Sequence, residues 1–69
     1  MKISARNILP GTVKTIKKGL VTTVVTLEIA PGVEVVSTIT SESFAALKLK
    51  KGQPASAIIK ESSVLIGVE

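Results

Sequence analysis

The sequence predicts an all-β fold, a small barrel with one short helix, and three observations lead to this fold class. Nine Val, eight Ile and seven Thr make 24 of the 69 residues β-branched, the type of residue that fits a pleated, half-buried sheet. Apolar and polar residues alternate within short segments, as they do along strands. Turn signals separate these segments, and they lie at Pro10-Gly11, Lys18-Gly19, Pro31-Gly32 and Lys51-Gly52.

The turn signals divide the chain into strands around one helix. Within Thr40–Leu47 the hydroxyl residues come first and Phe44 and Leu47 follow at helical spacing, which predicts an N-cap and a short helix. Three strands, a helix and two strands is the order of an OB-like five-stranded barrel. No linker or repeat divides residues 1–69, so we expect a single domain. The expected strands are Gly11–Lys17, Leu20–Ile29, Val33–Thr40, Ala55–Lys60 and Ser63–Val68, with a further extended piece over Met1–Asn7.

The residue types that are missing exclude most reaction chemistry. The chain has no Cys and no His, so it can form no disulfide, no thiolate or imidazole metal site and no Cys-based or His-activated nucleophile. Its acidic residues are five Glu spread along the chain, and nothing in the pattern pairs two of them in a pocket. We therefore expect a protein that is not an enzyme and that holds no cofactor.

Length and hydropathy together predict self-association. A chain of 69 residues hides only about 60% of the surface that its unfolded form exposes. Because 45% of the residues are hydrophobic, the surplus apolar surface is expected in contacts with other copies. No apolar run reaches the length of about 18 residues that spans a bilayer, and the first residues lack an apolar signal core, so we expect a cytoplasmic protein with no membrane partner.

A net charge of +4 and a pI near 9.8 favour an anionic partner. A basic OB barrel that binds single-stranded nucleic acid is one alternative, but such grooves use aromatic stacking platforms and Phe44 is the one aromatic residue here. A second alternative is a protein that binds a compact oxyanion, because hydroxyl, N–H and cationic groups are the donors that bind such an anion. A purely structural oligomerisation unit is a third possibility.

Hydroxyl and basic residues that suit an oxyanion gather in three separate segments. Each segment also has a structural explanation, because Thr40 and Ser43 can cap the helix, Ser62 can turn the chain, and Ser4 and Arg6 can be a solvated terminus. The segments are Ser4–Asn7, Thr40–Ser43 and Lys60–Ser63.

The same segments resemble the molbindin family, the small Mop proteins that bind molybdate or tungstate and are related to TOBE domains. SARN at Ser4–Asn7, ITSES followed by FAALKL at Ile39–Leu49, KKGQ, and IKESSVLIGV at Ile59–Val68 carry the resemblance along the whole chain. It implies an OB-like barrel whose dimers exchange a strand and assemble into a hexamer, a trimer of dimers, with the oxyanion held at subunit interfaces. It implies reversible binding for storage, buffering or delivery, with no metal ligand from the protein.

The residues that the resemblance assigns to the oxyanion site come from all three segments. In the family, Ser and Arg of the first segment, two hydroxyls at the start of the helix and a Lys in the last segment supply the donors. Main-chain groups near Ala5 and Glu61 and the hydroxyl of Ser62 complete the set. Carried over to this chain, the site residues are Ser4, Ala5, Arg6, Thr40, Ser43, Lys60, Glu61 and Ser62.

Three positions depart from the family pattern. Lys48 stands where the family usually has Gly, so we expect the helix to end differently. Glu61 stands where small residues are common, so its carboxylate must either point away from a bound anion or weaken the binding of that anion. Pro10 lacks an N–H, which could alter the pairing of the first strand.

Overall fold

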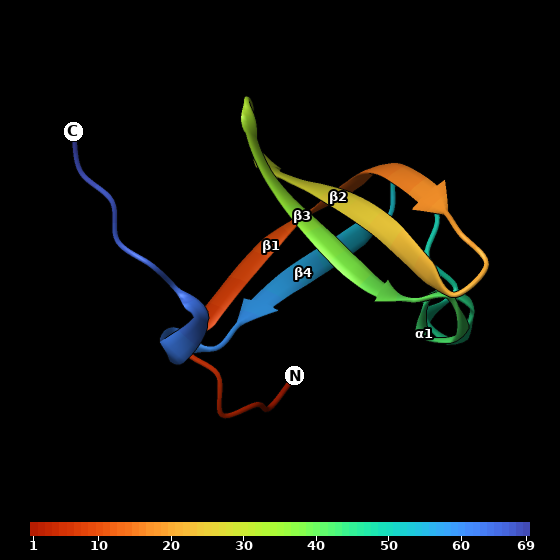
Figure 1. Cartoon of the computed structure of the whole chain (residues 1–69), viewed down its shortest axis with the longest axis horizontal. Helices are drawn as coiled ribbons and strands as arrows, with labels where there is room; N and C mark the ends of the chain where they lie inside the picture. The colour runs from red at the N-terminus through yellow and green to blue at the C-terminus, as the bar shows by residue number, and fades with distance from the viewer.

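The computed structural model describes residues 1–69, in which four antiparallel strands form one curled sheet in the order β3-β2-β1-β4 (Figure 1). The prediction of an all-β fold with one short helix is confirmed. Figure 1 shows the hairpin of β2 and β3 crossing over β1 and β4, which makes one face of the sheet concave. The elements are β1 (Asn7–Lys18), β2 (Thr22–Ala30), β3 (Val33–Thr40), α1 (Ser41–Leu47), β4 (Pro54–Ile59) and the 3-10 turn η1 (Glu61–Ser63).

The sheet curls because β1 changes its partner halfway along its length. Its first half, Asn7–Thr12, pairs with β4, whereas its second half pairs with β2 from Thr12 onward. A register shift against β2 follows at Val13/Thr15, and such a bulge bends a strand and increases its twist. Gly11 lies at the bend, where a Cβ atom would come within 2.6 Å of the Glu28 carbonyl oxygen. Only glycine allows the two backbones to approach this closely.

A very small core lies on the concave face. Val13, Val25 and Leu27 are its only buried apolar side chains. The alternation expected in the second strand is confirmed for Thr23, Val25 and Leu27, which are all buried, but Val21 precedes β2 and is exposed. Half-buried side chains surround the core, and they are Ile16, Ile29, Ile39, Phe44, Leu49, Ala55 and Ala57.

The helix forms where the hydroxyl-rich segment predicts it. The Thr40 Oγ1 accepts a hydrogen bond of 3.0 Å from the Ser43 backbone N–H, so Thr40 is the N-cap. Phe44 packs against the core, whereas Leu47 is exposed. No helix of the chain has the length and apolar character needed to cross a bilayer.

The expectation that the helix ends differently without glycine is wrong. Lys48 itself adopts the left-handed conformation, with φ 53° and ψ 44°, and its N–H donates a hydrogen bond of 3.1 Å to the Ala45 carbonyl. The chain therefore ends the helix with the usual left-handed geometry although a side chain is present. This geometry lowers the stability of the fold at Lys48, because a Cβ atom disfavours the left-handed conformation.

The prediction of a fifth strand at Ser63–Val68 is wrong for the single chain. The sheet has four strands, and residues 64–69 have no regular structure and lead away from it (Figure 1). No strand of the same chain pairs with this segment, and an extended backbone without a partner forms no ladder. Its large apolar side chains Leu65, Ile66 and Val68 are 91%, 88% and 93% exposed.

The first strand also differs from its predicted bounds, because it begins at Asn7 instead of Gly11. Its pairing with β4 runs through Pro10, opposite Ser56, without a register shift. The missing N–H of Pro10 does not disturb the register, since this half of β1 has a partner on one side only. Met1–Asn7, expected to be extended, contributes only Asn7 to a strand.

Replacing Lys48 with Gly should stabilise the protein. We expect Lys48→Gly to raise the free energy of unfolding by about 1 kcal/mol, because glycine adopts the left-handed conformation without a Cβ penalty. Urea unfolding at a fixed protein concentration measures the change. The control Ala46→Gly places glycine inside the same helix, where it should lower stability by about 1 kcal/mol. A Lys48→Gly protein less stable than the original would contradict the strain argument.

Candidate functional site

The pairing of β1 with β4 brings the first and last predicted segments together. Asn7 lies opposite Ile59 in the ladder. Arg6 precedes Asn7 and Lys60 follows Ile59, so both cations lie at the same end of the sheet. The Arg6 Nε lies 3.4 Å from the Glu61 Oε1, an ion pair that joins the two segments. We call this group the Arg6 end, and its members are Ser4, Ala5, Arg6, Lys60, Glu61 and Ser62.

The Arg6 end is open to solvent and rich in donors. Arg6, Lys60 and the hydroxyls of Ser4 and Ser62 belong to exposed residues, and only Ala5 is half-buried. Its two cations suit an anion, because guanidinium and ammonium groups only donate hydrogen bonds. The Glu61 carboxylate points to Arg6 and is the one acceptor side chain of opposite charge at this end.

Thr40 and Ser43 lie at the other end of the sheet. Thr40 pairs with Thr22 at the start of β2, next to Thr23, whose partner is Lys18 at the far end of β1. Figure 1 shows α1 and η1 at opposite ends of the molecule. We call these two residues the helix-start pair; their hydroxyls are 2.9 Å apart and both residues are exposed.

One chain therefore does not bring the eight predicted site residues together. The full length of β1 separates the Arg6 end from the helix-start pair. A small oxyanion cannot contact both groups of the same chain. A site that uses all eight residues needs at least two copies of the chain, with the Arg6 end of one copy beside the helix-start pair of another.

Sequence reasoning missed two residues that hold the helix-start pair in place. Thr23 is fully buried, and its Oγ1 lies 2.8 Å from the Ser41 Oγ. Ser41 donates its hydroxyl proton to the Gly19 carbonyl at 2.7 Å, so the proton between the two hydroxyls must come from Thr23. The Ser41 N–H also donates to the Val21 carbonyl at 2.8 Å. The signal in the sequence is Thr23 itself, a polar residue on the apolar face that requires a buried partner.

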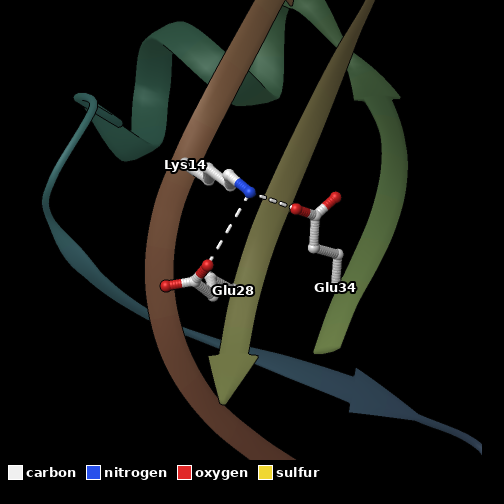
Figure 2. Close-up of polar contacts among 3 residues, drawn as sticks. All are labelled: Lys14, Glu28 and Glu34. Atoms are coloured by element: carbon white, nitrogen blue, oxygen red, sulfur yellow. Dashed lines mark hydrogen bonds and ion pairs between the residues drawn. The ribbon is translucent and has the colours of Figure 1, made fainter. Parts of the chain in front are cut away.

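Lys14 is paired with two carboxylates and is therefore not available to bind an anion. Glu28 and Glu34 lie directly opposite each other on β2 and β3, an arrangement in which like charges repel. Figure 2 shows the Lys14 Nζ between them, donating to Glu34 Oε2 and lying 3.7 Å from Glu28 Oε2. The hydrogen bond and charge of Glu34 raise the pKa of Lys14 above its ordinary value. Lys14 therefore offsets one of the two Glu charges and is held on the sheet surface by these ion pairs.

An apolar hollow of about 320 Å³ lies on the concave face, between β2, β3, α1 and β4. Seven of its nine lining residues are hydrophobic, and the other two are Ser37 and Ser56. Without a cation, the hollow does not suit an oxyanion. It is apolar surface that a partner could cover.

Comparison with known proteins relates this geometry to one family. Residues 3–66 match the TOBE domain. The chain is 50% identical over 66 residues to molybdenum-pterin-binding protein 3 of Clostridium pasteurianum, covering 96% of this chain and 97% of the relative. The fold superimposes on MopII from Clostridium pasteurianum with a TM-score of 0.91 and 43% identity, covering 97% of this chain and all of MopII.

A second solved structure adds a bound ligand. It is the cytoplasmic molybdate-binding protein ModG in a form with molybdate bound. The TM-score is 0.93 and the identity is 52%, with 100% of this chain covering 49% of ModG. The chain is thus similar over its full length to a part of a protein that holds molybdate.

The cluster of Lys14, Glu28 and Glu34, which we call the Lys14 cluster, predicts that the stability of the protein depends on pH. A pKa raised above the ordinary 10.5 means that folded Lys14 holds its proton more tightly than the unfolded chain does. The stabilisation is fully present below pH 10.5 and is lost as the pH rises through the higher pKa of the folded state. Lys14→Met should therefore lower the free energy of unfolding by a constant amount from about pH 7 to about pH 10, and by less near pH 11.

Urea unfolding across this pH range tests the prediction. Lys17→Met is the matched control, since it removes the same charge from an exposed residue that forms no ion pair. A stability difference for Lys14→Met that stays constant through about pH 11 would show that the cluster does not act through the charge of Lys14.

Proposed function

Because the chain belongs to the TOBE domain family, we propose that it binds molybdate reversibly and releases it unchanged. The observation that carries this proposal is the 52% identity, over the whole chain, to ModG with molybdate bound. The resemblance to Mop proteins, drawn from the sequence, is confirmed by MopII and by the relatives named molybdenum-pterin-binding proteins. These relatives are named as binding proteins, which supports a role in binding instead of catalysis.

Tungstate is included in the proposed ligand class. The chain has no Cys or His to bond a metal, so recognition acts on the oxygen shell of the anion. Molybdate and tungstate have nearly the same size and charge and offer the same acceptors. Storage, buffering and delivery of the oxyanion are all consistent with reversible binding. We place this role in the cytoplasm, where ModG is described.

The proposed site lies between copies of the chain. The Arg6 end supplies the cations Arg6 and Lys60, the hydroxyls of Ser4 and Ser62, and the main chain near Ala5 and Glu61. The helix-start pair of a second copy supplies the hydroxyls of Thr40 and Ser43. The separation of these groups within one chain supports this arrangement, as does their exposure. Donors from two copies would surround the anion without a competing acceptor, apart from Glu61.

The proposed assembly is a strand-exchanged dimer, three of which form a hexamer. Two features of the single chain support the exchange. The hollow on the concave face is uncovered, and Leu65, Ile66 and Val68 are almost fully exposed. If the C-terminal segment of one copy paired with the sheet of another, both apolar surfaces would leave water and the unpaired backbone would gain hydrogen bonds. The number of copies rests on the family resemblance, and sedimentation measures it.

Competition calorimetry tests the ligand. We expect saturable binding of molybdate, nearly equal competition by tungstate and at least about tenfold weaker binding of sulfate. A cage of hydroxyl and N–H donors set for the larger ions leaves one or two donors unpaired around the smaller sulfate, at about 1–3 kcal/mol each. Titration with a single-stranded oligonucleotide is the control for the nucleic-acid alternative. If sulfate displaces molybdate at comparable concentration, the size-matched site is wrong.

A mixing experiment tests the two-copy site. Arg6→Ala should weaken molybdate binding by about 2–4 kcal/mol and Ser43→Ala by about 1 kcal/mol, because each removes donors from one half of the site. Co-expression of both variants should restore some tight sites, since an interface can combine the intact Arg6 end of one with the intact Ser43 of the other. Mixing Arg6→Ala with Lys60→Ala, two defects in the same half, should restore none. Equal recovery in both mixtures would contradict the arrangement.

A further inference from the structure

The ion pair between Arg6 and Glu61 engages the guanidinium that the proposed oxyanion site requires. The Arg6 Nε lies 3.4 Å from the Glu61 Oε1, and the side chains are 84% and 63% exposed. A carboxylate and an oxyanion accept hydrogen bonds from the same donors. Glu61 and a bound oxyanion therefore compete for Arg6.

We propose that Glu61 is an affinity-determining residue of the oxyanion site, an internal anion that occupies Arg6 until molybdate displaces it. The inference rests on the function proposed above. The proposal concerns the side chain of Glu61. The main chain near Glu61 keeps the separate role proposed above, as a donor to the oxyanion. Its consequence is weaker binding and easier release than the same site would show with a neutral residue at this position.

The charges at the Arg6 end support the proposal. Lys60 has no carboxylate within ion-pair distance in the structure, whereas Arg6 is paired with Glu61. Molybdate carries two negative charges, and of the two cations that the Arg6 end offers it, Lys60 is free of a carboxylate and Arg6 already has one beside its Nε. Binding must either displace the Glu61 carboxylate from Arg6 or accept it as a like charge beside the dianion. Both outcomes lower the affinity.

The exposure of the pair limits the size of the effect. The Glu61 side chain makes no hydrogen bond, and its ion pair with Arg6 is its one polar contact, so it can turn into solvent without losing another partner. An exposed ion pair contributes little in water. Glu61 therefore adjusts the affinity of Arg6 for the oxyanion without blocking the site.

No other carboxylate of the chain has this relation to a site cation. Glu28 and Glu34 engage Lys14 on the sheet, away from both proposed half-sites. Glu42 and Glu69 form no ion pair. The competition is therefore specific to Glu61, which allows a control that changes charge without changing the pair.

Glu61→Gln tests the proposal, because it keeps the size of the side chain and removes its charge. Titration of the assembled protein with molybdate should show about threefold to fivefold tighter binding, a change equivalent to roughly 0.7–1 kcal/mol, which is the upper range for an exposed ion pair. Glu34→Gln makes the same change in net charge outside the site and should alter the affinity by less than about twofold. Unchanged or weaker binding by Glu61→Gln overturns the proposal. Glu61→Ala serves as a second variant if Gln disturbs the assembly, which sedimentation reports.

A double variant shows whether the effect acts through Arg6. In an Arg6→Gln background, Glu61→Gln should strengthen binding by less than about twofold, because no guanidinium remains to be freed. An equal gain in both backgrounds would mean that Glu61 acts as a distant charge, and it overturns competition for Arg6. As an independent readout, the ¹⁵N–¹H signal of the Arg6 Nε should move when Glu61→Gln is introduced without ligand. An unmoved signal argues against the pair.

Failure of the proposed function has a different result from failure of this inference. If neither the original protein nor Glu61→Gln binds molybdate in saturable fashion, the proposed function is wrong and the role of Glu61 falls with it. If both bind molybdate with equal affinity, the function holds and the competition for Arg6 is wrong.

Discussion

An apolar concave face that the single chain leaves uncovered is the constraint on which the rest of this structure depends. The sheet curls where β1 exchanges its β4 partner for β2, but four strands do not close it into a barrel. Only three apolar side chains are buried, while the hollow beside them and the C-terminal residues remain in contact with water. Because burial of apolar surface is the main favourable contribution to folding, a chain with this core is expected to fold fully only with other copies.

The same topology explains why the candidate site is divided. Antiparallel pairing places the residues before β1 beside those after β4, and the helix begins at the opposite end of the sheet. Each end therefore presents an incomplete set of donors. Hydroxyls anchored by Thr23 and Ser41 lie at one end, and the cations lie at the other. In the proposed assembly, the contacts that cover the apolar surface would also join the two half-sites, so stability and binding would arise together.

Three positions that depart from the family pattern show how a fold absorbs local changes. The backbone of Lys48 keeps the left-handed helix end although its side chain disfavours it. Pro10 fits because the first half of β1 is paired on one side. Glu61 is the first residue of the 3-10 turn η1, and its side chain places a negative charge beside Arg6. The first change is expected to lower the stability of the fold, the second leaves the strand register unchanged, and the third alters the charge that a ligand meets.

Local interactions determined what the sequence alone could predict. Alternation and β-branched residues predicted the strands, and the hydroxyl cap with Phe44 at helical spacing predicted α1, because both signals act between near neighbours. The absence of Cys and His excluded disulfides, thiolate and imidazole metal sites, and Cys-based or His-activated nucleophiles. Only the tertiary structure decided that the last apolar segment finds no partner in its own chain, that Arg6 meets Glu61, and that Thr40 and Ser43 lie at the far end. These features depend on strand order and register, which join residues distant in the sequence and have no local signal.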